Sequence, residues 1–259
     1  MRKTELHTLK EGIIIGFKSI LQYRVNFYSS LLVYHMDIIA SIFLLYVFTQ
    51  VAYIDFPLTM IIFFILIRLL WTSFFTSMTK TSFSLFPTLT KGEMNIFLTR
   101  PSPPYLLYLA RGYRTRWLII SGYTFILFSL FILYNELSYL KFLGVLCTSI
   151  IFSYSYFSIY QLFDSLSFFY IKPNTQNLYR TNRQLASYPP TFYEQFNYRF
   201  IFFLFPMVLH GVATLYYFGE LSLLYYIIVL SIALIVSLII NFSTYIMWKY
   251  GLKKYEAFG

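Results

Sequence analysis

Five ionisable side chains interrupt stretches of sequence that are otherwise apolar: His35, Asp37, Arg68, Asp164 and His210. Burying an ion in hydrocarbon costs about 2.5–3.5 kcal/mol even on insertion scales, so such groups normally face protein or water. Asp37 and Arg68 fall at matching depth in consecutive runs, which predicts a structural ion pair; contact with a substrate or an ion is the alternative. His210 is expected to bond to a neighbouring helix. Asp164 is expected either to reach the inner membrane interface or to lie at the cytoplasmic end of the helical bundle.

No string in the sequence would form a catalytic centre. A phosphate-binding loop needs G-x-x-x-x-G-K-[ST], and neither this string nor H-E-x-x-H nor G-x-S-x-G occurs. The three histidines and the single Cys147 do not follow the spacing of a metal site. We therefore predict no catalytic residue, no metal and no cofactor bound by this chain. If ATP powers the protein, another chain supplies the nucleotide site.

The elements that must position these side chains are six apolar runs, each about as long as a hydrocarbon core requires. They are Phe27–Val51, Leu58–Met78, Trp117–Tyr134, Tyr139–Tyr160, Phe200–Phe218 and Leu221–Met247. With both termini in the cytoplasm, 18 of the 20 basic residues fall on that side, while Lys141 lies outside and Arg68 lies mid-span. Because basic loops remain in the cytoplasm, the sequence predicts an all-α polytopic membrane protein with six transmembrane helices and cytoplasmic termini.

The composition indicates a single membrane domain over residues 1–259. Hydrophobic residues make up 58% of the chain and charged residues only 12%, which leaves no soluble domain of useful size outside the spans. A net charge of +10 is also typical of nucleic-acid binding. Here the positive charges are confined to the inner segments, where anionic headgroups attract each of them by about 1 kcal/mol. Membrane lipid, and not nucleic acid, is the expected partner of these charges.

Three segments outside the spans are long enough to carry function. Within residues 1–26, Thr4–Arg24 has apolar residues at helical spacing and predicts an amphipathic helix in the inner interface. A plain helical lead-in to the first span is the alternative. The inner loops 79–116 and 169–199 are long, whereas the outer connections are short. The protein therefore presents its surface to the cytoplasm.

The loop 79–116 carries the most distinctive string, Lys91-Gly92-Glu93-Met94-Asn95-Ile96-Phe97-Leu98-Thr99-Arg100-Pro101-Ser102-Pro103-Pro104. Gly92 permits a tight or left-handed turn, and Met94–Leu98 predicts a short amphipathic helix. Proline cannot continue a helix, so the following prolines should end it and stiffen the return to the membrane. A short helix held below the membrane is what a cytoplasmic motor would push. A loop lying flat along the membrane fits the same string.

These residues resemble those of a known family. The sequence is similar to ABC-2-type permeases, the membrane subunits of ATP-binding-cassette exporters, in a branch of about this chain's length first grouped as a domain of unknown function. The match is carried by Gly92-Glu93 with Leu98-Thr99-Arg100-Pro101, by Tyr188-Pro189 and Pro206, and by the closing Gly251-Leu252-Lys253-Lys254-Tyr255-Glu256. Asn95 stands where family members often have Asp.

The resemblance implies a type V exporter-like fold in the cytoplasmic membrane of a bacterium. The first inner loop would form a coupling helix on a dimeric ABC ATPase subunit, which would hold ATP and Mg²⁺. A second permease, identical or a homologue of similar size, would pack around a central pathway, and a re-entrant hairpin often follows the fifth span. The residues expected to couple to the ATPase are Phe83, Gly92, Glu93, Met94, Phe97, Arg100 and Pro101.

We therefore expect a permease that moves a lipophilic or amphipathic small molecule, such as a drug, lipid or peptide, out of the cytoplasm or inner leaflet. Short outer loops offer no dock for a binding protein, which favours export. Two alternatives remain, an ion-coupled secondary transporter and a membrane scaffold that recruits a cytoplasmic partner. The sequence has no clear internal repeat of the kind that many secondary transporters carry.

Overall fold

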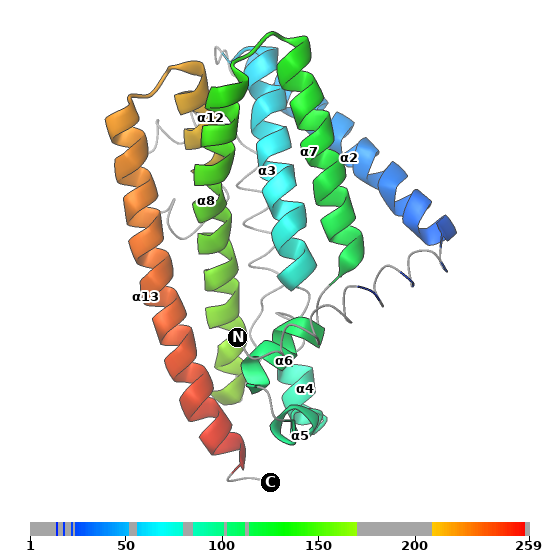
Figure 1. Ribbon diagram of the computed structural model, residues 1–259, viewed down its shortest axis with the longest axis vertical. Helices are drawn as coiled ribbons and strands as arrows, with labels where there is room; N and C mark the ends of the chain where they lie inside the picture. Colours follow the sequence, from blue (N-terminus) through cyan, green and yellow to red (C-terminus); the bar gives the residue numbers. More distant parts are fainter. Residues whose placement is uncertain are drawn as a thin grey trace.

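The computed structural model describes residues 14, 18, 22, 24–51, 56–79, 85–100, 103–111, 114–169 and 209–256. Within these ranges every regular element is a helix. Long helices form an elongated bundle, and short helices form a separate layer at one end of it (Figure 1). Of the expected interfacial helix 4–24, Ile14, Lys18, Gln22 and Arg24 are described, each as helical. The loop 170–199, with Tyr188 and Pro189, lies outside the described residues.

Five helices are long and apolar enough to cross a membrane. They are α2 (Arg24–Val51), α3 (Leu58–Thr79), α7 (Thr115–Tyr134), α8 (Tyr139–Ser165) and α13 (Leu223–Glu256). Each coincides with a predicted span. α8 and α13 continue past the predicted ends at 160 and 247, because neither extension contains a proline and the polar residues that end a hydropathy run do not end a helix.

The fifth predicted span, Phe200–Phe218, is described only in its last part. That part is α12 (His210–Phe218), which ends at Gly219 in the left-handed conformation. The Tyr217 hydroxyl donates to the Ser138 carbonyl oxygen over 3.1 Å, and the Lys141 ammonium lies 5.2 Å from the centre of the Tyr216 ring. α12 is thus held against the start of α8, at the end of the bundle away from the short helices (Figure 1).

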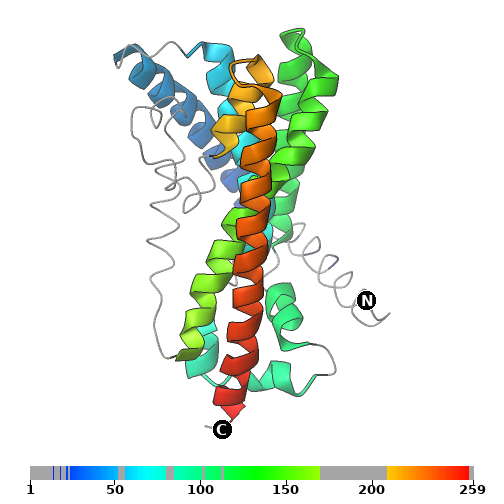
Figure 2. The same ribbon diagram turned by 90° about the vertical axis from the view of Figure 1, so that its left-hand side faces the viewer.

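α8 and α13 run side by side in the same direction, as Figure 2 shows. Three hydrogen-bonded pairs set this course: Thr148 with Tyr226 at 2.6 Å, Ser155 with Ser237 at 2.5 Å, and Asn241 with Ser158 at 2.7 Å. From one pair to the next, the residue numbers on both helices increase, which only parallel helices allow. Small hydroxyl side chains at the contact also let two helices approach closely within a membrane.

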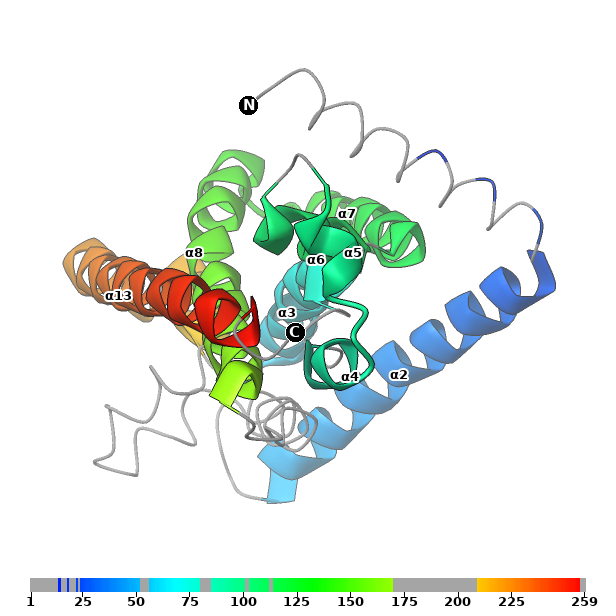
Figure 3. The same cartoon turned by 90° about the horizontal axis from the view of Figure 1, so that it is seen from below.

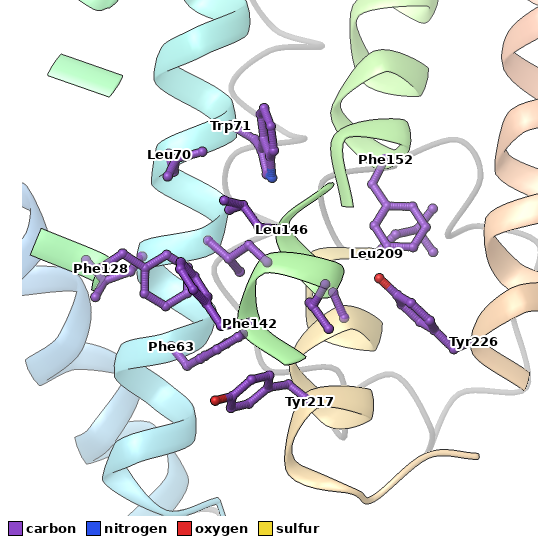
Figure 4. Close-up of a cluster of buried hydrophobic side chains, with 14 of the residues drawn as sticks. Phe63, Leu70, Trp71, Phe128, Phe142, Leu146, Phe152, Leu209, Tyr217 and Tyr226 are labelled. Carbon is purple, nitrogen blue, oxygen red and sulfur yellow. The ribbon is translucent and has the colours of Figure 1, made fainter. Parts of the chain in front are cut away.

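The main core lies where α3, α7, α8, α12 and α13 meet (Figure 4). Phe63 is its centre, with ring centroids 4.8 Å from Phe128 and 4.4 Å from Tyr217. Phe128 in turn lies 4.7 Å from Phe142. A polar bond also crosses this core, from the Trp71 indole N–H to the Ser149 hydroxyl at 2.7 Å. Interlocking rings of this kind fix the register of the helices.

A layer of short helices lies beyond the end of α3. In the view from below, these helices lie in front of α3 (Figure 3). It comprises α4 (Leu85–Thr90), α5 (Asn95–Leu98) and α6 (Pro104–Arg111). The 3-10 turn η2 (Leu166–Phe169) follows α8 directly and packs on α4 and α13. Where the structure describes the loop 79–116, most of it is therefore helical.

Candidate functional site

The turn between α4 and α5 depends on Gly92. Its φ of +70° lies in the left-handed region, where a side chain would be strained. The Gly92 N–H donates to the Leu89 carbonyl at 3.1 Å, and the Gly92 carbonyl accepts from the Asn95 N–H at 3.2 Å. The left-handed turn expected at Gly92 is thus confirmed. It points α5 back across the end of the bundle.

α5 is amphipathic, as the sequence predicts. Met94 and Phe97 are buried, with 0% and 4% of their surface exposed, whereas half of Ile96 is exposed. The face directed away from the bundle is formed by Lys91, Asn95, Ile96, Thr99 and Arg100. Glu93 is partly buried at its edge. The result is a small exposed surface of mixed polar, basic and apolar character, which we call the α5 face.

The expected end of the short helix before the prolines is confirmed, because α5 ends at Leu98. Pro104 is the first residue of the next helix, α6, where its fixed φ and missing N–H suit a helix start. Phe83 and Pro101, both expected to contact an ATPase, lie outside the described residues.

Trp248 of α13 is the centre of an aromatic cluster that joins this layer to the bundle. Its ring centroid lies 5.1 Å from Tyr105, 5.4 Å from Tyr108 and 4.9 Å from Phe168. Phe97 of α5 continues the cluster through an edge contact with Tyr108 at 6.4 Å. Rings from α5, α6, η2 and α13 therefore pack as one unit, and displacement of α5 must move its neighbours.

Gly251 lets η2 approach α13. A Cβ atom at this position would collide with the Cβ and Cγ atoms of Phe168. Because Phe168 is buried against Trp248 one helical turn earlier, the ring has little room to move away. Gly251 opens the closing motif of the chain, and close packing gives a physical reason for a glycine there.

Asp164 fastens the layer to the last turn of α8. Only 2% of its surface is exposed, and its Oδ2 atom accepts a hydrogen bond of 2.6 Å from the Tyr108 hydroxyl. The carboxyl group also accepts from the backbone N–H of Leu85, the first residue of α4. A carboxylate is favourable at a helix N-terminus, whose N–H groups lack partners within the helix. Of the two positions expected for Asp164, the structure has the one at the end of the bundle.

The Tyr105 phenol lies in a part of this junction from which much of the solvent is excluded. Burial raises the pKa of this phenol to about 12, and the nearby Tyr154 and Asp164 add to the shift. The junction between layer and bundle is an aromatic contact with the buried carboxyl group of Asp164 beside it.

The remaining predicted polar residues lie within the bundle. His210 is fully buried and bonds through Nε2 to the Ser153 hydroxyl at 2.9 Å, which confirms a bond to a neighbouring helix. His35 bonds to the Tyr123 hydroxyl and, at 2.7 Å, to the Leu31 carbonyl.

Arg68 is buried, and its guanidinium lies 5.7 Å from the Phe64 ring centre. The charges of Asp37 and Arg68 both act on the Tyr34 hydroxyl. A direct ion pair between them stays a prediction.

Reasoning from the sequence missed Tyr108 and Trp248, the partners that complete the junction. A signal for Tyr108 existed, because Tyr105 and Tyr108 follow the helix-starting Pro104 at the three-residue spacing of one helical face. Trp248 directly follows the last predicted span, Leu221–Met247. Only long-range packing shows that both residues meet Asp164 or its neighbours.

Comparison with known proteins gives one match. A sequence profile described as "ABC-2 family transporter protein" matches residues 31–259, which include all of α3 to α13 and most of α2. Neither the curated proteins nor the solved structures give a match. The matched region contains the α5 face, the Asp164 junction and the closing motif at Gly251. The chain therefore belongs to the ABC-2 transporter family, and it is a membrane permease component of an ABC transporter.

Proposed function

We propose that the permease is an exporter subunit in the cytoplasmic membrane of a bacterium, and that its α5 face docks on a separate ABC ATPase. One observation carries this proposal. The exposed α5 face is backed by buried Met94 and Phe97 and is fixed to α8 and α13 through Asp164 and Trp248. Because this surface is joined to two long helices, a displacement imposed on it by the ATPase can be transmitted to the bundle.

The coupling requires a difference in binding. A motor shifts a transporter between two states only if it binds nucleotide with different affinity in each. Closure of an ATPase dimer against the α5 face would move α5 and α6 together, because the aromatic cluster packs their rings against each other. The parallel pair α8 and α13 would then carry the motion across the membrane. The ATPase holds ATP and Mg²⁺, and this chain supplies the pathway.

The short outer turns support outward transport. The connection from α7 to α8 spans only Asn135–Ser138, and Gly219–Ser222 joins α12 to α13. These turns give no platform for a binding protein that would deliver a substrate from outside. We propose outward movement of a lipophilic or amphipathic small molecule, through a pathway shared with a second permease that is identical or homologous. A scaffold without cargo flux is the rival function.

Acidic side chains introduced on the α5 face test whether this face is the docking surface. Arg100→Glu and Ile96→Asp should each lower recovery of the ATPase subunit from native membranes at least about tenfold, because interface contacts of this kind contribute about 1–2 kcal/mol or more. Recovery is measured by affinity purification in mild detergent followed by mass spectrometry. Both side chains are exposed, so neither change should disturb folding.

Glu220→Lys is the matched control, a charge reversal on an exposed residue at the opposite end of the molecule. It should leave ATPase recovery unchanged. Equal recovery with all three variants would show that the ATPase does not use the α5 face. Undiminished ATPase binding together with the absence of cargo flux in proteoliposomes would favour the scaffold.

A further inference from the structure

A line of polar side chains joins α2 to α7 within the predicted membrane region. Arg116 donates from Nη1 to the Ser30 hydroxyl at 2.8 Å, His35 bonds to the Tyr123 hydroxyl, and Tyr34 bonds to Thr124 at 2.7 Å. We call this line the α2–α7 seam. α2 also contacts α3, through an apolar cluster to which α2 gives Tyr34, Ile38 and Leu45. Its axis leans away from the bundle (Figures 1 and 3).

The seam opens to the surface that would face lipid. Ser30, His35, Arg116 and Tyr123 are each partly exposed, in contrast to the buried pair of Tyr34 and Thr124. A polar group at membrane depth normally faces the bundle interior or a water-filled cavity, because hydrocarbon offers it no hydrogen bond. Polar side chains that stay partly exposed at such a surface indicate that a polar group of another molecule contacts them there.

The seam also has a direction. With a rise of about 1.5 Å per residue, Tyr123 lies about 10 Å deeper along α7 than Arg116. On α2, His35 lies about 7 Å deeper than Ser30 by the same rise. The hydrogen-bonding groups therefore form steps from the predicted inner interface toward the middle of the membrane. Exposed apolar side chains of α2, such as Leu32 and Met36, flank them.

The charge at the inner end of the seam is positive. The Arg116 guanidinium lies 5.7 Å from the Trp117 ring centre, and Ser30 is the hydrogen-bond partner that the described residues give it. Most of its five N–H donors are thus left for a further acceptor. Burial and the charge of Arg116 lower the pKa of Arg114, the residue before α7. Two cations that repel one another would both be stabilised by an anion.

We propose that the α2–α7 seam binds the anionic headgroup of the exporter's cargo, an amphiphile taken from the inner leaflet. The headgroup is a carboxylate or a phosphate, which a guanidinium can bind with two parallel hydrogen bonds. It meets Arg116 first and the Tyr123 and His35 groups next, while the hydrocarbon tail stays against α2. This proposal rests on the proposed exporter function and names its substrate class.

Photolabelling of the full chain in phosphatidylcholine nanodiscs tests the seam. The probe is a long-chain fatty acid that carries a diazirine in its tail, and labelled peptides are mapped by mass spectrometry. We expect labelling within residues 24–39 and 114–130. Lysophosphatidylglycerol should compete with the probe, whereas lysophosphatidylcholine should not, because only the former carries a net negative charge.

The matched variants are Arg116→Gln and Lys141→Gln. Arg116→Gln should weaken labelling of the seam about tenfold, since a hydrogen bond to a charged group contributes about 1.5–3 kcal/mol. Lys141→Gln, a loss of charge at the outer end of α8, should leave labelling unchanged. Arg116→Lys should retain a part of it. If Arg116→Gln does not fold, the competition in the native chain still decides between the two headgroups.

Competition by both lysolipids alike, or unchanged labelling with folded Arg116→Gln, would overturn the proposal. Ready disulfide formation in native membranes between two chains carrying Leu32→Cys and Cys147→Ser would do so as well, because the seam would then be covered by a second permease. The assay needs no ATPase, so its failure leaves the docking of the motor untouched. Failure to recover an ATPase would instead remove the proposed function.

Discussion

At the residue scale, Asp164 is the side chain on which the junction depends most. It accepts from both Tyr108 and the first N–H of α4, whereas an asparagine there would keep only one acceptor oxygen. Asp164→Asn places an amide N–H against one of the two donors. An unsatisfied buried donor costs about 1–3 kcal/mol, so we expect about 2 kcal/mol of destabilisation. Thermal unfolding of the detergent-solubilised chain measures it.

Tyr108→Phe separates the two bonds at Asp164. It removes the hydroxyl but keeps the ring against Trp248, and Asp164 still accepts from Leu85. The expected loss is smaller, about 1 kcal/mol. The double variant should lose less than the sum of the two single changes, because both act on one bond. Strict additivity would mean that the bond between Tyr108 and Asp164 does not stabilise the junction.

At the element scale, η2 packs on α13, and Gly251 permits this close contact. Replacement of a helical glycine by alanine normally stabilises a helix by about 1 kcal/mol. Gly251→Ala should do the opposite and lower the unfolding temperature, because the added Cβ collides with Phe168. Gly144→Ala in α8 is the control, since its Cβ would meet nothing within 4 Å. If both changes stabilise the chain equally, η2 does not pack as described.

The long helices could be predicted from the sequence, whereas their packing could not. Apolar runs long enough to cross a membrane predict the starts of α3 and α8 and the ends of α2 and α7. Such a run forms a helix, because within hydrocarbon its backbone N–H and C=O groups must hydrogen-bond to one another. The short α5 was also predictable, since Gly92 marks its turn. The junction was not, because Tyr108, Asp164 and Trp248 are far apart in sequence and nothing local joins them. The polar seam was missed for the same reason: Arg116 looks like one more basic residue of a loop.

At the scale of the whole molecule, the parallel course of α8 and α13 bears on the number of spans. η2 ends at Phe169, at the end of the bundle that carries the short helices, and α12 lies at the other end (Figure 1), so six spans stay the prediction. We therefore expect Tyr134 and Glu220 on the outside, and Ile96 and Lys253 inside. With Cys147 replaced by Ser, an impermeant maleimide should label Tyr134→Cys and Glu220→Cys on intact cells. Ile96→Cys and Lys253→Cys should react only after permeabilisation. Labelling of Lys253→Cys but not Glu220→Cys on intact cells would exclude the sixth span.

The central claim is that the α5 face of this permease receives an ABC ATPase. The most direct measurement places a photo-crosslinking amino acid at Ile96, which is half exposed on that face. The chain is then crosslinked in its native membrane and purified. We expect a crosslinked nucleotide-binding subunit, together with vanadate-sensitive ATPase activity in the uncrosslinked complex. Recovery of the chain alone, without ATPase activity before or after crosslinking, would contradict the account.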